Sequence, residues 1–167
     1  MSDLILLAVG ATALFVIYLV RVLWGRGRAA PKNTPANYAI IVDGSNVMHW
    51  GGEPSVKVLR GVIRAVTAKG FAPYVIFDAN VGYKLEGRYL DDVPMALLIG
   101  VPARSVLVVE KGVSADERIL EVATERGLRV VSNDRFRDWS VTYPIVRQKG
   151  RILRGDWKGG NVVWRSK

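Results

Sequence analysis

The sequence contains no cysteine, and its 167 residues include a single histidine. The absence of cysteine excludes disulfide bonds, zinc sites built from thiolates and a cysteine nucleophile. It also fits a domain that faces the cytosol, where disulfides are rare. Internal repeats and low-complexity segments are lacking too.

Acidic residues are too few to balance the basic ones: 15 Asp and Glu stand against 24 Lys and Arg, a net charge of +9 at pH 7. This excess suits a polyanionic partner such as nucleic acid or an anionic membrane surface, although basic residues also keep many proteins soluble. Residues 37–128 hold 10 basic and 11 acidic side chains, whereas residues 129–167 hold 10 and 3. The basic character therefore lies in the last quarter of the chain.

Charged residues are absent from a long apolar run that begins at Leu4 and ends at Val20. With the apolar residues up to Trp24, the run reaches about 20 residues, which is enough to cross the hydrocarbon core of a bilayer. We therefore expect a transmembrane anchor over residues 4–24, a glycine- and proline-containing linker over residues 25–36, and a folded domain over residues 37–167.

The charges around the apolar run predict its orientation. Asp3 precedes it, and Arg21, Arg26, Arg28 and Lys32 follow it. By the positive-inside rule, we expect a single-pass membrane protein with its C-terminal domain in the cytoplasm. A cleaved signal peptide is the main alternative, but it would carry its positive charge before the apolar run. A buried core helix is the other alternative, and uniform apolarity on all its faces is unusual in so small a domain.

Beyond residue 37, short apolar runs alternate with amphipathic segments. Apolar runs predict strands over residues 38–42, 72–77, 105–109 and 129–132. Helical periodicity and capping residues predict helices over residues 55–69, 92–99 and 114–126. A short strand at 145–146 and a hairpin formed by 152–154 and 161–164 are expected near the C-terminus. Strands that alternate with helices predict an α/β fold with a central parallel sheet.

Acidic residues recur where these elements begin or end. Asp43 and Asp134 follow the first and fourth predicted strands, and Asp116 opens the helix between the third and fourth. Asp138 comes four residues after Asp134, so a helical turn there would place both on one face. Ligands of open parallel sheets bind at the carboxyl ends of the strands. The sequence therefore predicts an acidic pocket there, although an aspartate after a strand is often only a turn former or helix cap.

Carboxylates that converge in one pocket need protons or a cation. Two of them at 4 Å repel by roughly 4 kcal/mol at an effective dielectric constant near 20. Mg²⁺ or Mn²⁺ is the natural counter-ion, because hard divalent cations prefer oxygen ligands. Such an ion polarises a phosphate and activates a water for in-line attack. Asn46 and Ser132, small polar residues beside the acids, are expected to orient a carboxylate or hold a water.

Two stretches resemble the signature motifs of NYN-domain ribonucleases of the Regnase-like type, which belong to the PIN-like nuclease superfamily. They are residues 41–47, Ile-Val-Asp-Gly-Ser-Asn-Val, and residues 131–138, Val-Ser-Asn-Asp-Arg-Phe-Arg-Asp. The resemblance implies a three-layer α/β/α sandwich and endonucleolytic cleavage of RNA that depends on Mg²⁺ or Mn²⁺. Its implied catalytic and metal-holding residues are Asp43, Asp116, Asp134 and Asp138.

The family often places an adjacent pair of acids at the start of the helix before its second motif. This chain has Ala115 followed by Asp116 there, so one acid of the pair is missing. That departure leaves open a second hypothesis, in which the domain binds RNA but does not cut it.

The basic C-terminal region has two candidate partners. Arg135, Arg137, Arg151 and Arg154 are candidates for binding RNA phosphates, with tryptophans between the later basic residues to stack on bases. The same basic region could instead face anionic headgroups. In that third hypothesis the protein is an adaptor at the membrane surface, and its acids have no catalytic role.

Overall fold

The structure is a computed structural model that describes residues 38–165. The predicted anchor at residues 4–24 and the linker at 25–36 lie outside the described residues. Within residues 38–165, no helix is both long enough and apolar enough to cross a bilayer.

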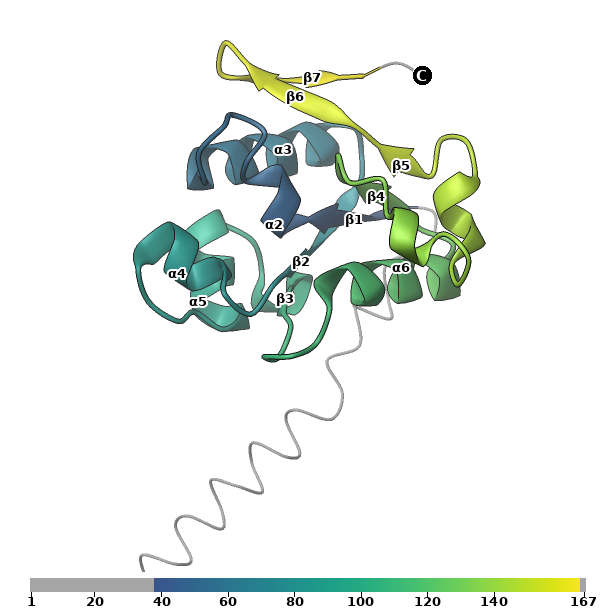
Figure 1. Ribbon diagram of the computed structural model, residues 1–167. Helices are drawn as coiled ribbons and strands as arrows, with labels where there is room; N and C mark the ends of the chain where they lie inside the picture. The colour runs from purple at the N-terminus through teal and green to yellow at the C-terminus, as the bar shows by residue number, and fades with distance from the viewer. Residues whose placement is uncertain (1–37, 166–167) are drawn as a thin grey trace, which may run out of the picture. The chain divides into compact units, whose positions relative to one another are not determined.

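Five parallel strands form the central sheet, in the order β3-β2-β1-β4-β5 (Figure 1). β1 therefore lies at the centre, between β2 and β4, and its residues 40–42 are fully buried. This observation confirms the predicted α/β fold with a central parallel sheet. The strands are β1 (Ala39–Asp43), β2 (Ala72–Phe77), β3 (Val106–Val108), β4 (Arg129–Val131) and β5 (Ile152–Leu153).

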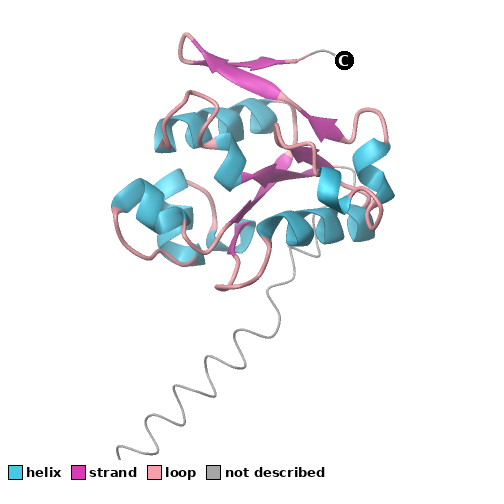
Figure 2. Ribbon diagram, viewed as in Figure 1, coloured by secondary structure: helices cyan, strands magenta, loops and turns pink. Residues whose placement is uncertain are grey.

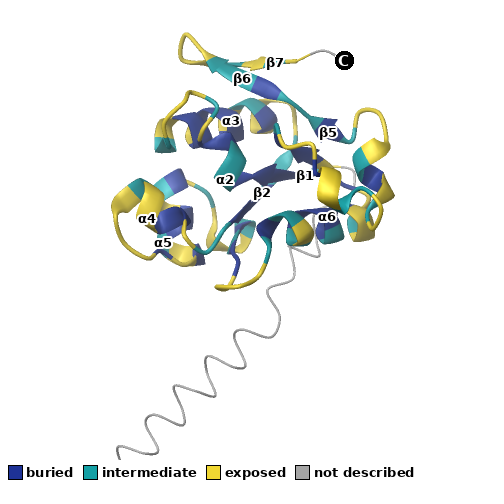
Figure 3. Cartoon of the chain, in the orientation of Figure 1, coloured by how far each residue is buried: buried dark blue, intermediate teal, exposed yellow. Residues whose placement is uncertain are grey.

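Helices cover both faces of this sheet (Figure 2). On one face, Ile40 and Val42 of β1 join the same apolar cluster as Leu59 and Val62 of α3 (Val56–Ala68). Ile41 points the other way because successive strand residues alternate between faces. On that second face, α6 (Ala115–Arg126) packs against β1 and β2. Because both faces are covered, β1 and β2 are buried over consecutive residues rather than at every second residue (Figure 3).

Short helices complete the domain, and several of them were not predicted. Asp43 ends β1 and caps α2, whereas α5 occupies the predicted residues 92–99. Residues 145–146, predicted as a strand, lie in a 3-10 helix that begins at Pro144, so that prediction was wrong. The helices not yet given are α2 (Gly44–Val47), α4 (Val81–Glu86), α5 (Asp92–Ile99), η1 (Ala103–Ser105), η2 (Arg137–Trp139) and η3 (Pro144–Arg147).

The C-terminal hairpin begins later than predicted. Ile152 and Leu153 pair in parallel with β4 as the fifth strand of the sheet. The hairpin is instead made by β6 (Gly155–Lys158) and β7 (Asn161–Trp164), which pair antiparallel. Gly159 and Gly160 have φ values of 56° and 80°, which suits a tight two-residue turn between strands.

The hairpin packs against α3 through a tryptophan that requires a glycine. A Cβ atom added at Gly61, in the middle of α3, would lie 2.2 Å from the ring of Trp157 in β6. Glycine is a poor helix former, about 1 kcal/mol worse than alanine. The glycine at position 61 is therefore explained by its contact with Trp157 and not by the needs of the helix.

We expect Gly61→Ala to lower the free energy of unfolding by about 1–3 kcal/mol, because the added methyl group overpacks against Trp157. In a Trp157→Ala background the same change should instead stabilise the domain by up to about 1 kcal/mol, through helix propensity alone. Urea unfolding of the wild type, the two single variants and the double variant measures both effects. Stabilisation by Gly61→Ala in both backgrounds would show that the hairpin does not press on α3.

Candidate functional site

An open cavity of about 270 Å³ lies at the carboxyl ends of β1, β2 and β4 and the start of α6. Four carboxylates line it, and none of its lining residues is a lysine or arginine. Three of the four predicted acids are among them: Asp43, Asp116 and Asp134. We call this the acidic cavity, and its full lining is Asp43, Ser45, Asn46, Asp78, Ser114, Asp116 and Asp134.

The parallel pairing of β1 with β4 explains why residues far apart in sequence meet here. Val42 pairs with Val131, so the residues that follow each of them emerge at the same edge of the sheet. Asp116 reaches this edge from the first turn of α6, which Ser114 caps by accepting a hydrogen bond from the Glu117 N–H at 3.3 Å.

Asp43 is the buried acid of the cavity, with 3% of its surface exposed. Its Oδ2 accepts a hydrogen bond from the Ser132 hydroxyl at 2.7 Å, and its Oδ1 accepts one from the Asn46 N–H at 3.0 Å. The Ser132 Oγ also accepts a hydrogen bond from the Asp134 N–H at 3.0 Å. Ser132 therefore joins the two sequence motifs at the position where their acids lie.

Burial and mutual repulsion raise the pKa values of two of these acids. The pKa of Asp43 is raised from 3.8 to about 7, mainly by desolvation and to a smaller extent by repulsion from Asp116 and Asp78. The hydrogen bonds from Ser132 and Asn46 act in the opposite direction and lower this pKa. Desolvation, followed by repulsion from Asp134 and Asp78, raises the pKa of half-buried Asp116 to about 6. At neutral pH, the simultaneous ionisation of all four carboxylates in the cavity is therefore unfavourable.

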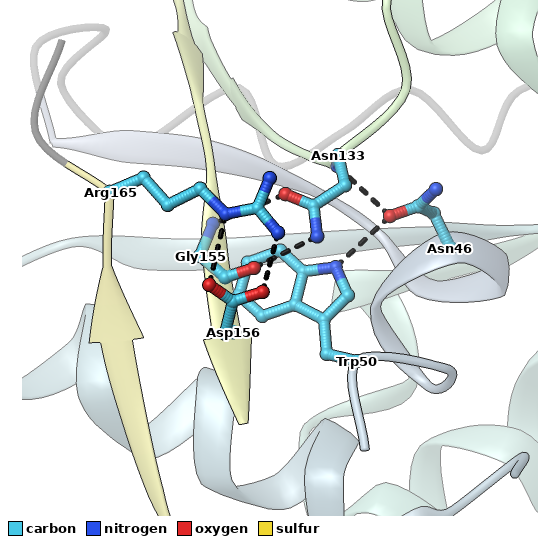
Figure 4. A network of polar contacts seen from close by, with 6 residues as sticks. All are labelled: Asn46, Trp50, Asn133, Gly155, Asp156 and Arg165. Atoms are coloured by element: carbon cyan, nitrogen blue, oxygen red, sulfur yellow. Dashed lines mark hydrogen bonds and ion pairs between the residues drawn. The ribbon is translucent and has the colours of Figure 1, made fainter. Parts of the chain in front are cut away.

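A polar network fixes the loop that carries Asp134 (Figure 4). The side-chain oxygen of Asn46 accepts hydrogen bonds from the Asn133 N–H at 2.9 Å and from the Trp50 Nε1 at 3.0 Å. The Asn133 side chain in turn donates to the Gly155 carbonyl at 2.8 Å and accepts from the Gly155 N–H at 3.3 Å. The start of the hairpin is thus bonded to the residue directly before Asp134.

Two glycines allow this packing. A Cβ atom at Gly44 would lie 2.1 Å from the ring of Phe77, so Gly44 makes room for β2 at the end of β1. A Cβ atom at Gly155 would lie 2.7 Å from the ring of Trp50. Both positions lack a side chain because an aromatic ring occupies the space.

Asp138 is the predicted acid that the structure places elsewhere. It lies exposed in η2 and does not line the acidic cavity. The helical turn that would have put it on one face with Asp134 does not form. Asp134 Oδ1 instead accepts a hydrogen bond from the Phe136 N–H at 2.6 Å, and Phe136 has a left-handed φ of 47°.

The four predicted arginines occupy different surroundings. Arg135 and Arg137 are exposed in the loop after Asp134. Arg154 donates from Nη2 to the Asp134 carbonyl at 3.4 Å. Arg151 donates to the Gly127 carbonyl at 2.8 Å and to the Gln148 side chain at 3.1 Å, so its guanidinium holds two loops together.

Sequence reasoning gave too little weight to Asp78, which lines the cavity. It follows β2, which lies directly beside β1, and its N–H donates to the Ser45 Oγ at 2.9 Å. The available signal was that Asp78 follows a buried parallel strand, as Asp43 does.

Comparison with solved structures shows that the fold is shared with much larger proteins. The structure titled "Crystal Structure of nuclear proteinaceous RNase P 2 (PRORP2) from A. thaliana" matches with a TM-score of 0.56 and 19% identity, over 76% of this chain and 29% of that chain. A second, titled "Arabidopsis thaliana nuclear protein-only RNase P 2 (PRORP2)", matches with a TM-score of 0.54 and 15% identity, over 95% of this chain and 34% of that chain. This chain thus spans about a third of each neighbour.

No curated protein sequence matches the chain. The model of the family described as "Zc3h12a-like Ribonuclease NYN domain", however, matches residues 37–163. This range contains both sequence motifs, the whole parallel sheet and most of the hairpin. The chain therefore belongs to the Zc3h12a-like ribonuclease NYN domain family.

Proposed function

We propose that this protein is a metal-dependent endoribonuclease that hydrolyses RNA phosphodiesters in the acidic cavity. The observation that carries the proposal is the convergence of Asp43, Asp116 and Asp134 on one cavity that no basic side chain lines. Membership of a ribonuclease family supports the same reaction class.

The lining of the cavity suits a hard divalent cation, Mg²⁺ or Mn²⁺. Its side chains offer carboxylate, hydroxyl and amide oxygens, the ligand types that these ions prefer. As placed in residues 38–165, no three His, Asp or Glu side chains form a ready-made metal cluster. Asp43, Asp116 and Asp134 would hold the ion, with Asp78 beside them. When bound, the ion would polarise the scissile phosphate and help to activate water.

The residues of the chain have separate tasks in this proposal. Ser132 and the Asn46 N–H hold the Asp43 carboxylate in one orientation. In the absence of a cation, burial and the neighbouring Asp134 and Asp78 raise the pKa of Asp116 to about 6, so a cation would compete with a proton for this carboxylate near neutral pH. Arg135 and Arg137 are exposed beside Asp134 and would contact the RNA backbone. Asp138 stays a predicted site residue outside the cavity.

We also propose that residues 4–24 anchor the protein in a membrane as a single-pass helix, with the nuclease domain in the cytoplasm. The support is the run without charged residues from Leu4 to Val20 and the basic residues that follow it.

A domain that binds RNA without cutting it is the second candidate function. The observation in its favour is Ala115, a buried residue at the position where related domains often carry another acid. With fewer carboxylates the cavity would hold a cation less tightly.

We expect the full chain to cut RNA with Mg²⁺ or Mn²⁺ and to stop when EDTA is added. Asp43→Asn and Asp134→Asn should each lower the cleavage rate by about a hundredfold or more, because each removes a carboxylate from the reacting centre. Glu53→Gln, which neutralises an exposed acid outside the cavity, is the matched control and should cleave at the wild-type rate. Gel analysis of a labelled RNA over time measures these rates.

Two other results of that assay would reject the nuclease proposal. RNA binding without cleavage at any metal concentration would establish the non-cutting domain. No RNA binding, together with stronger retention on anionic than on neutral vesicles, would establish the membrane-surface adaptor.

The raised pKa of Asp43 predicts how stability depends on pH in the absence of divalent cations. Between about pH 4 and 7 the folded state binds a proton at Asp43 that the unfolded state has released, so stability should fall as the pH rises through this range. Asp43→Asn keeps the shape without the titration. Relative to this variant, the wild type should lose on the order of 3 kcal/mol between pH 4.5 and pH 8.

Thermal unfolding at a series of pH values, with EDTA present, measures this difference. Adding Mg²⁺ should restore stability to the wild type at pH 8 far more than at pH 5, because protons and the cation compete for the same carboxylates. Identical pH profiles for the wild type and Asp43→Asn would show that Asp43 is already ionised at low pH.

A further inference from the structure

A second cavity, of about 560 Å³, lies at the amino-terminal ends of the strands, whereas the acidic cavity lies at their carboxyl ends. It is lined by the first residues of β4 and β5, by Phe71 just before β2, and by the C-terminal end of α3. The hairpin contributes its end strand through Trp164 and Arg165. We call it the basic cavity, and its full lining is Ile40, Val66, Lys69, Phe71, Arg129, Lys149, Gly150, Ile152, Leu153, Arg154, Trp164 and Arg165.

The charged groups of the basic cavity all have one sign. Five of its lining residues are lysine or arginine and none is acidic. Lys69 and Lys149 are exposed and form no ion pair within residues 38–165. Of the five basic lining residues, Arg165 alone is ion-paired in that range, with Asp156. The Nε of Arg154 is buried and has no hydrogen-bond partner. A buried donor without a partner costs free energy, so an anionic oxygen there would be stabilising.

The floor of the basic cavity is apolar and mostly aliphatic. Ile40, Val66 and Ile152 are each at most 4% exposed, with partly buried Leu153 beside them. The two aromatic rings are already engaged: the Arg129 guanidinium lies 5.4 Å above the Phe71 ring, and Trp164 packs at 87° against Trp50. Nucleic-acid bases bind by stacking on free aromatic faces. This floor therefore suits a hydrocarbon chain better than a base.

We propose that the basic cavity binds an anionic phospholipid, with the phosphate among the basic side chains and the start of an acyl chain on the apolar floor. This inference rests on the proposed membrane anchor. Residues 25–37 separate the predicted anchor from the described domain and can span at most about 45 Å. Ile40, close to the point where that linker enters the domain, lines the cavity. A lipid of the surrounding membrane is thus within reach.

Such a lipid would also contact Arg154, which forms a hydrogen bond with the loop that carries Asp134. Arg154 lines the basic cavity, and its Nη2 donates to the carbonyl of Asp134 at 3.4 Å. A phosphate bound at its Nε would hold the guanidinium in place between the two cavities. The nearest chemical alternatives are a free phosphate ion and the backbone of RNA, and the experiment must separate them.

The test uses the full chain in phosphatidylcholine vesicles that contain increasing fractions of phosphatidylglycerol with a photoactivatable acyl chain. After illumination, mass spectrometry maps the labelled peptides. We expect the phosphatidylglycerol probe to label β5, which contains Leu153, and β7, which contains Trp164. A photoactivatable phosphatidylcholine should label these two strands markedly less. Labelling of residues 4–24 by either lipid reports the anchor separately, so failure of the anchor and failure of the cavity are distinguishable.

At a fixed, subsaturating phosphatidylglycerol fraction, the variant Lys69→Gln/Lys149→Gln should lower the labelling of the cavity about twenty-fivefold, at about fivefold for each charge. Lys57→Gln/Lys111→Gln removes two exposed lysines outside the cavity and is the matched control for net charge. It should label like the wild type.

Several results would overturn the proposal. One is label on residues 4–24 with none in the cavity, and another is equal label from the two lipids. Equal loss of label in the two double variants would show a diffuse effect of net charge. Loss of cavity label on adding inorganic phosphate would assign a free-anion site, and loss on adding a short RNA would assign a substrate site.

Discussion

The hydrogen bond from Ser132 to Asp43 is the contact on which the candidate site depends. It joins residues 89 positions apart and places a nearly buried carboxylate next to the loop of a second acid. Burying a carboxylate is costly, and here two hydrogen bonds, from Ser132 and Asn46, only partly offset that cost. The remaining cost appears as the raised pKa of Asp43. A site with this property gains stability from any cation that neutralises it, and the burial of Asp43 thus supports the proposed metal dependence.

The C-terminal hairpin belongs to the support of the site, although it lies outside the central sheet. Trp157 packs on Gly61 of α3, and Asn133 exchanges hydrogen bonds with the backbone of Gly155. Asn46 connects these contacts to the first motif. The loop carrying Asp134 is therefore held from the sheet on one side and from the hairpin on the other. A family match that extends to residue 163, almost to the end of β7, is consistent with this arrangement.

The fold separates charges of opposite sign along the strands. The carboxyl ends of β1, β2 and β4 meet at the acidic cavity, and the opposite ends of β1, β4 and β5 meet at the basic cavity. Arg154 lies near both, since it lines the second and hydrogen-bonds the Asp134 loop. In the proposed function one end of the sheet performs chemistry on RNA, and the other end is available to a different anionic partner.

The sequence by itself determined the class of fold and most of the acids. Continuous apolar runs with acids at their ends are local patterns, so β1, β2, α3, α5 and α6 could be read within a few residues of their observed bounds. Tertiary structure decided which acids meet. Strand order placed Asp78 at the cavity, and a left-handed Phe136 turned the chain so that Asp138 does not line it. It also moved residues 152–153 into the parallel sheet and built the basic cavity from separate segments between residues 40 and 165. Such outcomes depend on contacts between distant segments, which local periodicity and propensity do not encode.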